Sequence, residues 1–234
     1  MKRIRALLLI DGPSDEPLGR HVAAIARGHG VALDIVAPEF DRMDPPPGRA
    51  ISARLTRILA IDPDFEMVVV HRDAENQGRD VRLAEIQAAL ADVQPALPHI
   101  PVIPLWMTEA WLLLDEAAIR SVAGRPSGTM ALSLPVAAQV ERDVDPKATL
   151  RQALRSASGH RGRRLRKFER DFSAHRRQLL NRLDRSGPLR ELRAWQELES
   201  DVATILAAVR DVPSQPGAAA SGTAGGTAEQ DEAP

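Results

Sequence analysis

The sequence predicts an α/β fold: a central, mostly parallel sheet flanked by helices, with a helical extension after it. Three short apolar runs end in turn or acidic residues: ALLLI before Asp11, MVVV before His71 and IPVIPLW shortly before Glu109. The runs are continuous rather than alternating, which is typical of strands that are covered on both faces. Helix-like stretches separate these runs, and this alternation indicates parallel strands joined by crossover helices.

The elements of the first part follow in order. ALLLI is predicted to be a buried strand, because the run has about half the length of a membrane-spanning helix and no small-residue cleavage site follows it. Ser14 as N-cap, acids in the first turn and Gly30 as a stop predict a helix over residues 14–30. VALDIVAP, residues 31–38, predicts another strand. Apolar residues at three-and-four spacing predict two further helices, over residues 49–61 and 81–93.

The second part of the chain predicts helices and then a tail. Asp145 as N-cap and Pro146 at the first helical position predict a helix that starts there. Two more helices are expected over residues 163–183 and 188–209. From Val212 onward the chain has almost no large apolar residue, which predicts disorder. The expected organisation is an α/β domain over residues 1–125, a basic helical extension packed on it over residues 126–211, and a disordered tail over residues 212–234.

Composition excludes several kinds of chemistry. The 234 residues include no cysteine, which rules out disulfides and thiolate sites and fits a reducing compartment, so we expect a cytoplasmic protein. No run approaches about 18 uninterrupted apolar residues, and no membrane role is expected. The formal net charge of -1 gives no sign of a nucleic-acid binder. Any such role must come from charge segregated along the chain.

Charge is segregated between His160 and Arg193, where twelve Lys and Arg stand against four Asp and Glu. This segment predicts contacts with the phosphate backbone of DNA or RNA. A solvated helical face, or a docking surface for an acidic partner, is the alternative. Aromatic residues for base stacking are scarce, so sequence-specific readout is not expected. The residues predicted to contact nucleic acid are Arg161, Arg163, Arg164, Arg166 and Lys167.

Acidic residues follow three of the predicted strands: Asp11 and Asp15, then Asp73 and Glu75, then Glu109. Ligands of parallel sheets bind at the carboxyl ends of the strands, so we expect these acids at one edge. Asp73 and Glu75 project to the same side if the backbone is extended there. Two carboxylates about 4 Å apart repel by roughly 4 kcal/mol at an effective dielectric of 20, which favours protonation or a bound cation. Oxygen ligands alone favour Mg²⁺ or Mn²⁺, although a single strand-end Asp is most often a turn or cap residue.

Four segments resemble the successive motifs of a bacterial family catalogued as domain of unknown function 4276, which is Toprim-like: LLLIDGPSDEPLG, VVVHRDAENQG, VIPLWMTEAWLLLDEAAIR and DPKATLRQAL. The resemblance covers most of residues 4–200. It implies a Toprim-type fold, the metal-binding domain shared by topoisomerases, primases and the nucleases of the overcoming-lysogenization-defect type. In those relatives a Glu-Gly segment and a later Asp-x-Asp segment hold Mg²⁺ for phosphodiester chemistry.

The resemblance assigns a role to each acid. Asp11 takes the position of the first-strand glutamate, and Asp15 that of the acid four residues on. Asp73 and Glu75 match the Asp-x-Asp pair, and Glu109 matches the later acid of the TEAW block. Asp73, Glu75 and Glu109 would bind metal, while Asp11 and Asp15 would complete a second metal site or activate water. Asp11 is one methylene shorter, and Glu75 one longer, than the usual residue, which leaves the role of Asp11 as a general base open.

Two further residues stand in the family-like segments. Lys147, in DPK, is a candidate for stabilising charge on the phosphate, and an ordinary exposed first-turn lysine is the alternative. His71 is a candidate for contact with metal or phosphate, and a hydrogen-bonded structural histidine is the alternative.

The implied function is a Mg²⁺- or Mn²⁺-dependent phosphodiesterase, a nuclease of antiphage defence. Relatives of this type work with an ATPase of the ABC or SMC-like class, and this sequence has no Walker-type glycine-rich loop of its own. Two alternatives stay open. One is a non-catalytic, degenerate Toprim module that binds nucleic acid or a partner ATPase. The other is a small-molecule phosphohydrolase that uses the same acidic edge.

Overall fold

The computed structural model describes residues 1–211, and the tail predicted over residues 212–234 lies outside the described residues. The described residues contain one sheet of four parallel strands in the order β2-β1-β3-β4. In the central strand, Leu7 is paired with Val36 on one side and with Val68 on the other. The predicted α/β fold with a parallel sheet is therefore confirmed. The strands are β1 (Lys2–Leu9), β2 (Val31–Val36), β3 (Met67–His71) and β4 (His99–Val102).

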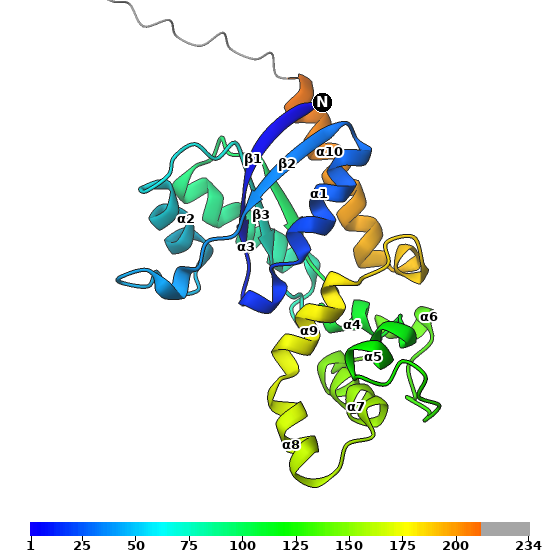
Figure 1. The fold of residues 1–234 in the computed structure, drawn as a ribbon. Helices are drawn as coiled ribbons and strands as arrows, with labels where there is room; N and C mark the ends of the chain where they lie inside the picture. The colour runs from blue at the N-terminus through cyan, green and yellow to red at the C-terminus, as the bar shows by residue number, and fades with distance from the viewer. Residues whose placement is uncertain (212–234) are drawn as a thin grey trace, which may run out of the picture.

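Helices cover both faces of the sheet (Figure 1). Leu7 and Val70 belong to the core that includes residues of α2 (Ile51–Leu59) and α3 (Arg79–Val93). Their neighbours Leu8 and Val69 face the opposite core, with residues of α1 (Leu18–Gly28) and α10 (Arg193–Asp211). Successive side chains of a strand point to opposite faces, so a strand buried on both faces needs an unbroken apolar run.

The first helix starts later than the sequence predicts. A 3₁₀ turn, η1 (Pro13–Asp15), follows β1, and α1 begins at Leu18 without a side-chain cap. The prediction of Ser14 as N-cap is therefore wrong. Its hydroxyl accepts a hydrogen bond of 2.8 Å from Arg176 instead. Gly30 follows the helix with a φ of 76°, a conformation that residues with a side chain rarely adopt, so this glycine does end the helix.

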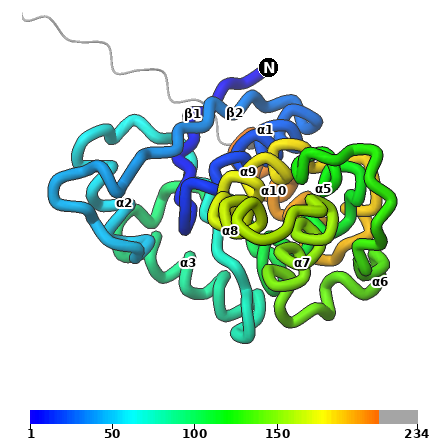
Figure 2. The backbone as a smooth tube through the Cα atoms, turned by 60° about the horizontal axis from the view of Figure 1, so that its bottom comes forward, coloured from blue at the N-terminus to red at the C-terminus, as the bar shows by residue number. Residues whose placement is uncertain are grey.

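A group of helices lies beyond the carboxyl ends of the strands (Figures 1 and 2). The helix predicted from Pro146 is confirmed, since the Asp145 carboxylate accepts a 2.9 Å hydrogen bond from the Ala148 N–H and Gly159 follows with a φ of 60°. The helix predicted over residues 163–183 is interrupted at Asp171. The members are α4 (Glu109–Leu112), α5 (Glu116–Val122), α6 (Ala137–Val140), α7 (Pro146–Ser158), α8 (Gly162–Arg170) and α9 (Phe172–Asn181).

The chain then returns to the sheet. After η3 (Pro188–Glu191), α10 packs against β4 and α1, while α9 packs against η1, α4 and α5. The helices after residue 125 thus contact the sheet domain at two places, its carboxyl edge and one face. Another 3₁₀ turn, η2 (Phe40–Arg42), lies between β2 and α2. Among residues 1–211, none of the helices has the length and apolarity that crossing a membrane requires.

Candidate functional site

The segments that follow β3 and β4 run side by side beyond the strands. Backbone N–H groups of Arg72 and Ala74 donate to the carbonyls of Val102 and Pro104, at 3.1 and 3.0 Å. This continued pairing brings Asp73 beside the first residues of α4. The acid after one strand therefore meets the acid after the next, as expected at the carboxyl edge of a parallel sheet.

Asp73 is fixed by several donors. Its Oδ1 accepts hydrogen bonds from the backbone N–H of Thr108 at 2.9 Å and from the Thr108 hydroxyl at 3.2 Å. The Nε2 of the buried His71 lies 3.3 Å from the same oxygen and 3.0 Å from the Thr108 hydroxyl. The carboxylate satisfies a free N–H group at the start of α4, and it positions the adjacent Glu109.

Arg176 of α9 joins the remaining two acids of this edge. Its Nη1 lies 2.6 Å from Asp15 Oδ1, and its Nε lies 3.0 Å from Glu109 Oε1. The side chains of Arg176, Asp15 and Glu109 are all at most 7% exposed. Asp15, Asp73, Glu109, His71 and Arg176 form one group, which we call the acid cluster; all are buried except Asp73, whose side chain is 23% exposed.

The environment shifts the pKa values in this cluster. Burial raises the pKa of Glu109, and the nearby Arg176 only partly offsets this. Burial alone would raise the pKa of Asp73, but its hydrogen bond with His71, together with the charges of His71 and Arg176, leaves the pKa below its ordinary value. Burial alone would lower the pKa of His71, but the carboxylates of Asp15 and Asp73 outweigh it and the pKa is raised. The carboxylates of the cluster thus favour the protonated, positively charged form of His71.

Asp11 and Glu75 lie outside the acid cluster, and each is paired with a different arginine. Asp11 accepts a hydrogen bond from Arg72, and its side chain is 40% exposed. Glu75 has a φ of 50°, so the backbone is not extended there, and its carboxylate lies 3.2 Å from Arg82. The expectation that Asp73 and Glu75 project to the same side requires an extended backbone, and it is therefore wrong.

Lys147 lies close enough to the acid cluster to act on it. It is an exposed residue in the first turn of α7, and α7 packs against α4, which carries Glu109. Its positive charge contributes to lowering the pKa of Glu109, against the larger effect of burial. The structure therefore brings the DPK segment to the edge that holds the acids.

The acid cluster has the ligand chemistry of a hard divalent-cation site but not its arrangement, because Arg176 holds two of its three carboxylates. Within residues 1–211, no three His, Cys, Asp or Glu side chains are arranged so that they could hold a metal ion. The oxygens of Asp15, Asp73 and Glu109 are nevertheless the ligand type that Mg²⁺ and Mn²⁺ take. A cation at this site competes with Arg176 for Asp15 and Glu109.

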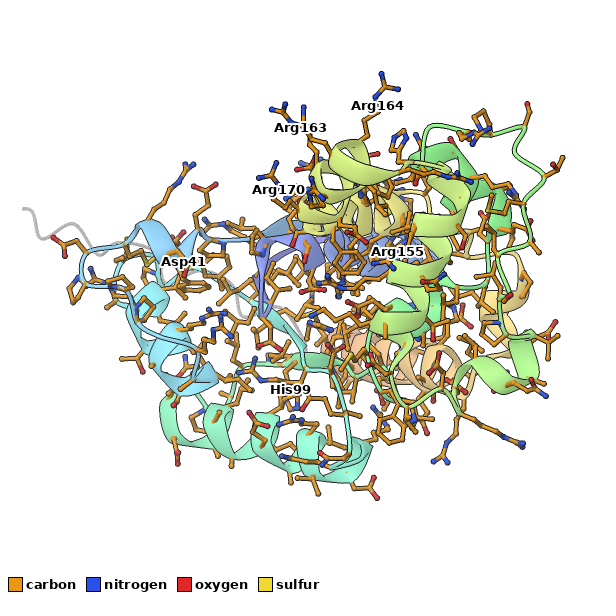
Figure 3. The ribbon with its side chains drawn as sticks, turned by 90° about the horizontal axis from the view of Figure 1, so that it is seen from below. Asp41, His99, Arg155, Arg163, Arg164 and Arg170 are labelled. Carbon is orange, nitrogen blue, oxygen red and sulfur yellow. The ribbon has the colours of Figure 1, made fainter. Side chains whose placement is uncertain are left out.

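The basic residues predicted to contact nucleic acid lie on or next to α8, which has no buried residue. Arg161, Arg163, Arg164, Arg166 and Lys167 are all exposed. In Figure 3, Arg163 and Arg164 extend away from the body of the molecule. The break at Asp171 separates this exposed helix from α9, so one interrupted helical segment presents cations to solvent along α8 and inserts Arg176 among the acids from α9.

Arg176 is the main residue of this site that we did not predict from the sequence. It stands on the apolar side of its helix, four residues after Phe172 and four before Leu180, both of which are buried. An arginine at such a position indicates a buried acidic partner, because buried charges are almost always paired. The spacing in FSAHRRQLL was therefore a usable signal.

A scan against protein-family models, a search of curated proteins and a search of solved structures each found no match to this chain.

Proposed function

We propose that this chain is a Toprim-like, Mg²⁺- or Mn²⁺-dependent phosphodiesterase that cleaves nucleic acid. The observation that carries the proposal is the convergence of Asp15, Asp73 and Glu109 from three separate segments at the carboxyl edge of the sheet. These three acids coincide with three of the five positions to which the resemblance assigns metal or catalytic roles. A strand-end acid taken singly is most often a turn or cap residue, whereas three that lie close together repel each other and favour a cation.

The residues around the cluster have distinct roles in this proposal. Asp15, Asp73 and Glu109 would hold the cation, which supplies polarisation of a phosphoryl oxygen and of water when it is bound. His71 and Thr108 keep the Asp73 carboxylate ionised and oriented. Lys147 would neutralise charge on the phosphate from the α7 side. Asp11, half-exposed at the same edge, is the candidate for positioning water.

The substrate and the partner follow from the surroundings of the site and from the resemblance. The exposed cations of α8 supply a sequence-independent contact for a phosphate backbone. The resemblance implies an ATPase partner of the ABC or SMC-like class in antiphage defence, which would supply the nucleotide hydrolysis for which this chain has no motif.

Cleavage assays test this function. The purified chain is incubated with plasmid, linear DNA and RNA in Mg²⁺, Mn²⁺ or chelator, beside Asp73→Asn and the matched variant Asp92→Asn, which changes an exposed acid of α3. We expect cleavage that needs the metal, is lost in Asp73→Asn and is kept in Asp92→Asn. Cleavage that persists in chelator or in Asp73→Asn contradicts the proposal.

The ion pairs of Arg176 favour a second candidate, a non-catalytic module in which the arginine permanently replaces the metal. Titration calorimetry with Mg²⁺ and Mn²⁺ separates the two candidates. A catalytic site binds metal in the wild type and loses this binding in Asp73→Asn. If the wild type binds no metal but Arg176→Gln does, the arginine fills the site and the module is non-catalytic.

A further inference from the structure

A hollow lies at the same edge of the sheet as the acid cluster, on the β2 side of β1. It is a groove of about 740 Å³, bordered by the ends of β1 and β2, by α1 and by the turns η1 and η2. Its lining includes Ile10, Gly12, Ala23, Ile35 and Arg54, none of which belongs to the acid cluster. We call this hollow the Arg54 groove.

Arg54 is held rigidly at the groove. It comes from α2 and is 6% exposed. Its Nε donates a 2.8 Å hydrogen bond to the carbonyl of Gly48, and its Nη1 donates to the carbonyl of Ile10. The guanidinium lies over the ring of Phe40, 4.9 Å from the ring centre. Two carbonyls and an aromatic face therefore fix the orientation of this cation.

The charge of Arg54 has no carboxylate partner. No salt bridge among the described residues includes it, although a buried arginine ordinarily has one. Its Nη2 donates no hydrogen bond within residues 1–211 and is not among the fully covered polar atoms. Because Arg54 lines the groove, this nitrogen and the uncompensated charge are available to a ligand there.

The other charged side chains of the groove are mostly neutralised. Arg177 pairs with Glu16 and Arg42 with Glu39, each at 2.5 Å. Asp11 accepts from Arg72, whereas the exposed Arg20 donates only to the uncharged Asn181 and keeps its charge. Asp41 also lines the groove, and its charge acts on Arg54 from a distance. Arg54 is therefore the buried cation of this groove without a carboxylate partner, and Asp11 and Asp41 are the acids that oppose an anion there.

We propose that the Arg54 groove binds a nucleotide, with a phosphate on Arg54 and the nucleoside along the apolar wall. Ile10, Ala23 and Ile35 supply that wall, and the volume falls in the range of small-molecule sites. Arginine suits phosphate because its planar donors match two phosphate oxygens. The wall favours a nucleotide over a bare phosphate ion. This proposal does not depend on the acid cluster, although Asp11, the candidate for positioning water, also lines the groove.

Calorimetry with three probes tests the proposal: adenosine 5′-monophosphate, adenosine and inorganic phosphate, all in chelator so that no metal contributes. We expect the monophosphate to bind at least tenfold more tightly than either of the others. Arg54→Gln should weaken monophosphate binding about tenfold or more, the loss of one charge-assisted contact. Arg57→Gln, which changes the next arginine of α2 and lies outside the groove lining, should leave it unchanged.

A second variant keeps the test independent of the fold around Arg54. Gly12 has a φ of -151°, and a Cβ built there meets no atom within 4 Å, so Gly12→Leu extends a side chain from the groove lining without disturbing the core. It should weaken monophosphate binding, while Asp73→Asn should not. The proposal is overturned if the wild type does not bind the monophosphate at millimolar concentration, or binds it no more tightly than inorganic phosphate. Full affinity in both Arg54→Gln and Gly12→Leu overturns it as well.

Discussion

The carboxyl edge of the sheet contains two arginines that are equally buried, each 6% exposed, in two very different surroundings. Arg176 lies between the carboxylates of Asp15 and Glu109, and its charge is compensated. Arg54 lies against two backbone carbonyls and the ring of Phe40, and its charge is not. Burial alone thus does not define the role of an arginine. Arg176 holds the helical group on the sheet, whereas Arg54 retains a charge that, in our proposal, an anion can use.

Replacing the two arginines should have very different effects on stability. Arg176→Met leaves two buried carboxylates without their partner, and we expect it to lower the free energy of unfolding by about 3–5 kcal/mol. Arg54→Met leaves only carbonyl groups unpaired, which costs about 1–3 kcal/mol. Urea unfolding of both variants measures these losses. Equal losses of unfolding free energy in the two variants would show that the ion pairs of Arg176 contribute no more to stability than the hydrogen bonds of Arg54.

A buried histidine that contacts the helix of Arg176 makes the free energy of unfolding depend on pH. His21 of α1 lies 2.7 Å from the carbonyl of Leu180, one helical turn after Arg176, and burial lowers its pKa to about 4. The unfolded chain takes up this proton near pH 6.5, while the folded protein does so only near pH 4. The stability that the neutral His21 contributes is therefore present above pH 6.5 and is lost as the pH falls to 4, by at most about 3 kcal/mol.

His21→Gln isolates this effect, because glutamine keeps a donor for the Leu180 carbonyl and cannot titrate. The free energy of unfolding should fall less between pH 7 and 4.5 in this variant than in the wild type. The exposed His29 provides the control, and His29→Gln should keep the wild-type dependence. If His21→Gln keeps the wild-type pH dependence of the free energy of unfolding, then the folded protein binds a proton at His21 as readily as the unfolded chain does.

Replacing two glycines that line the Arg54 groove tests how tightly the walls of the groove are packed. A Cβ on Gly19 would lie 2.9 Å from Ile35 Cγ2 and 3.1 Å from Leu8 Cδ2, whereas one on Gly12 would meet nothing within 4 Å. Gly19→Ala should lower the free energy of unfolding by about 1–2 kcal/mol, because the side chains of Ile35 and Leu8 must shift. Gly12→Ala should stay within about 0.5 kcal/mol of the wild type. Similar melting curves for both variants would mean that the wall at Gly19 can adapt.

The fold was largely predictable because its strands are buried on both faces. Unbroken runs such as MVVV cannot be half-exposed strands, and the acid that follows each run then falls at the carboxyl edge. The position of Asp73 and Glu109 depends only on this topology, and for that reason both were expected correctly at one edge. The failure of Ser14 as an N-cap was not predictable, because its hydroxyl is engaged by an arginine 162 residues away.

The details of the two arginine sites depended on local backbone and on distant partners. Glu75 lies outside the acid cluster because its backbone is left-handed, and the neighbouring residue types do not predict this conformation. Asp11 accepts a hydrogen bond from Arg72, 61 residues away in the sequence. Arg54 stands three residues after Ile51 and four before Ile58, both buried, so its spacing indicated burial as that of Arg176 did. Its contacts with Gly48 and Phe40 were not predictable, because that loop has no regular periodicity.

The exposed helix α8 completes the contrast, because its arginines are neither buried nor fixed. The triple variant Arg163→Glu, Arg164→Glu and Arg166→Glu should change the free energy of unfolding by less than about 0.5 kcal/mol, since α8 has no buried residue. It should weaken DNA binding and reduce the slope of log affinity against log salt by about 0.9 for each phosphate contact that is lost.

The matched control places the same charge change at the opposite end of the sheet, with Arg3→Glu, Arg27→Glu and Arg210→Glu, three exposed residues near the start of β1 and the ends of α1 and α10 (Figure 1). Fluorescence anisotropy of a labelled duplex across a salt series measures both variants. If α8 is a phosphate-binding surface, only the α8 variant loses slope. If both variants lose affinity equally, the effect comes from net charge alone, and α8 is a solvated face.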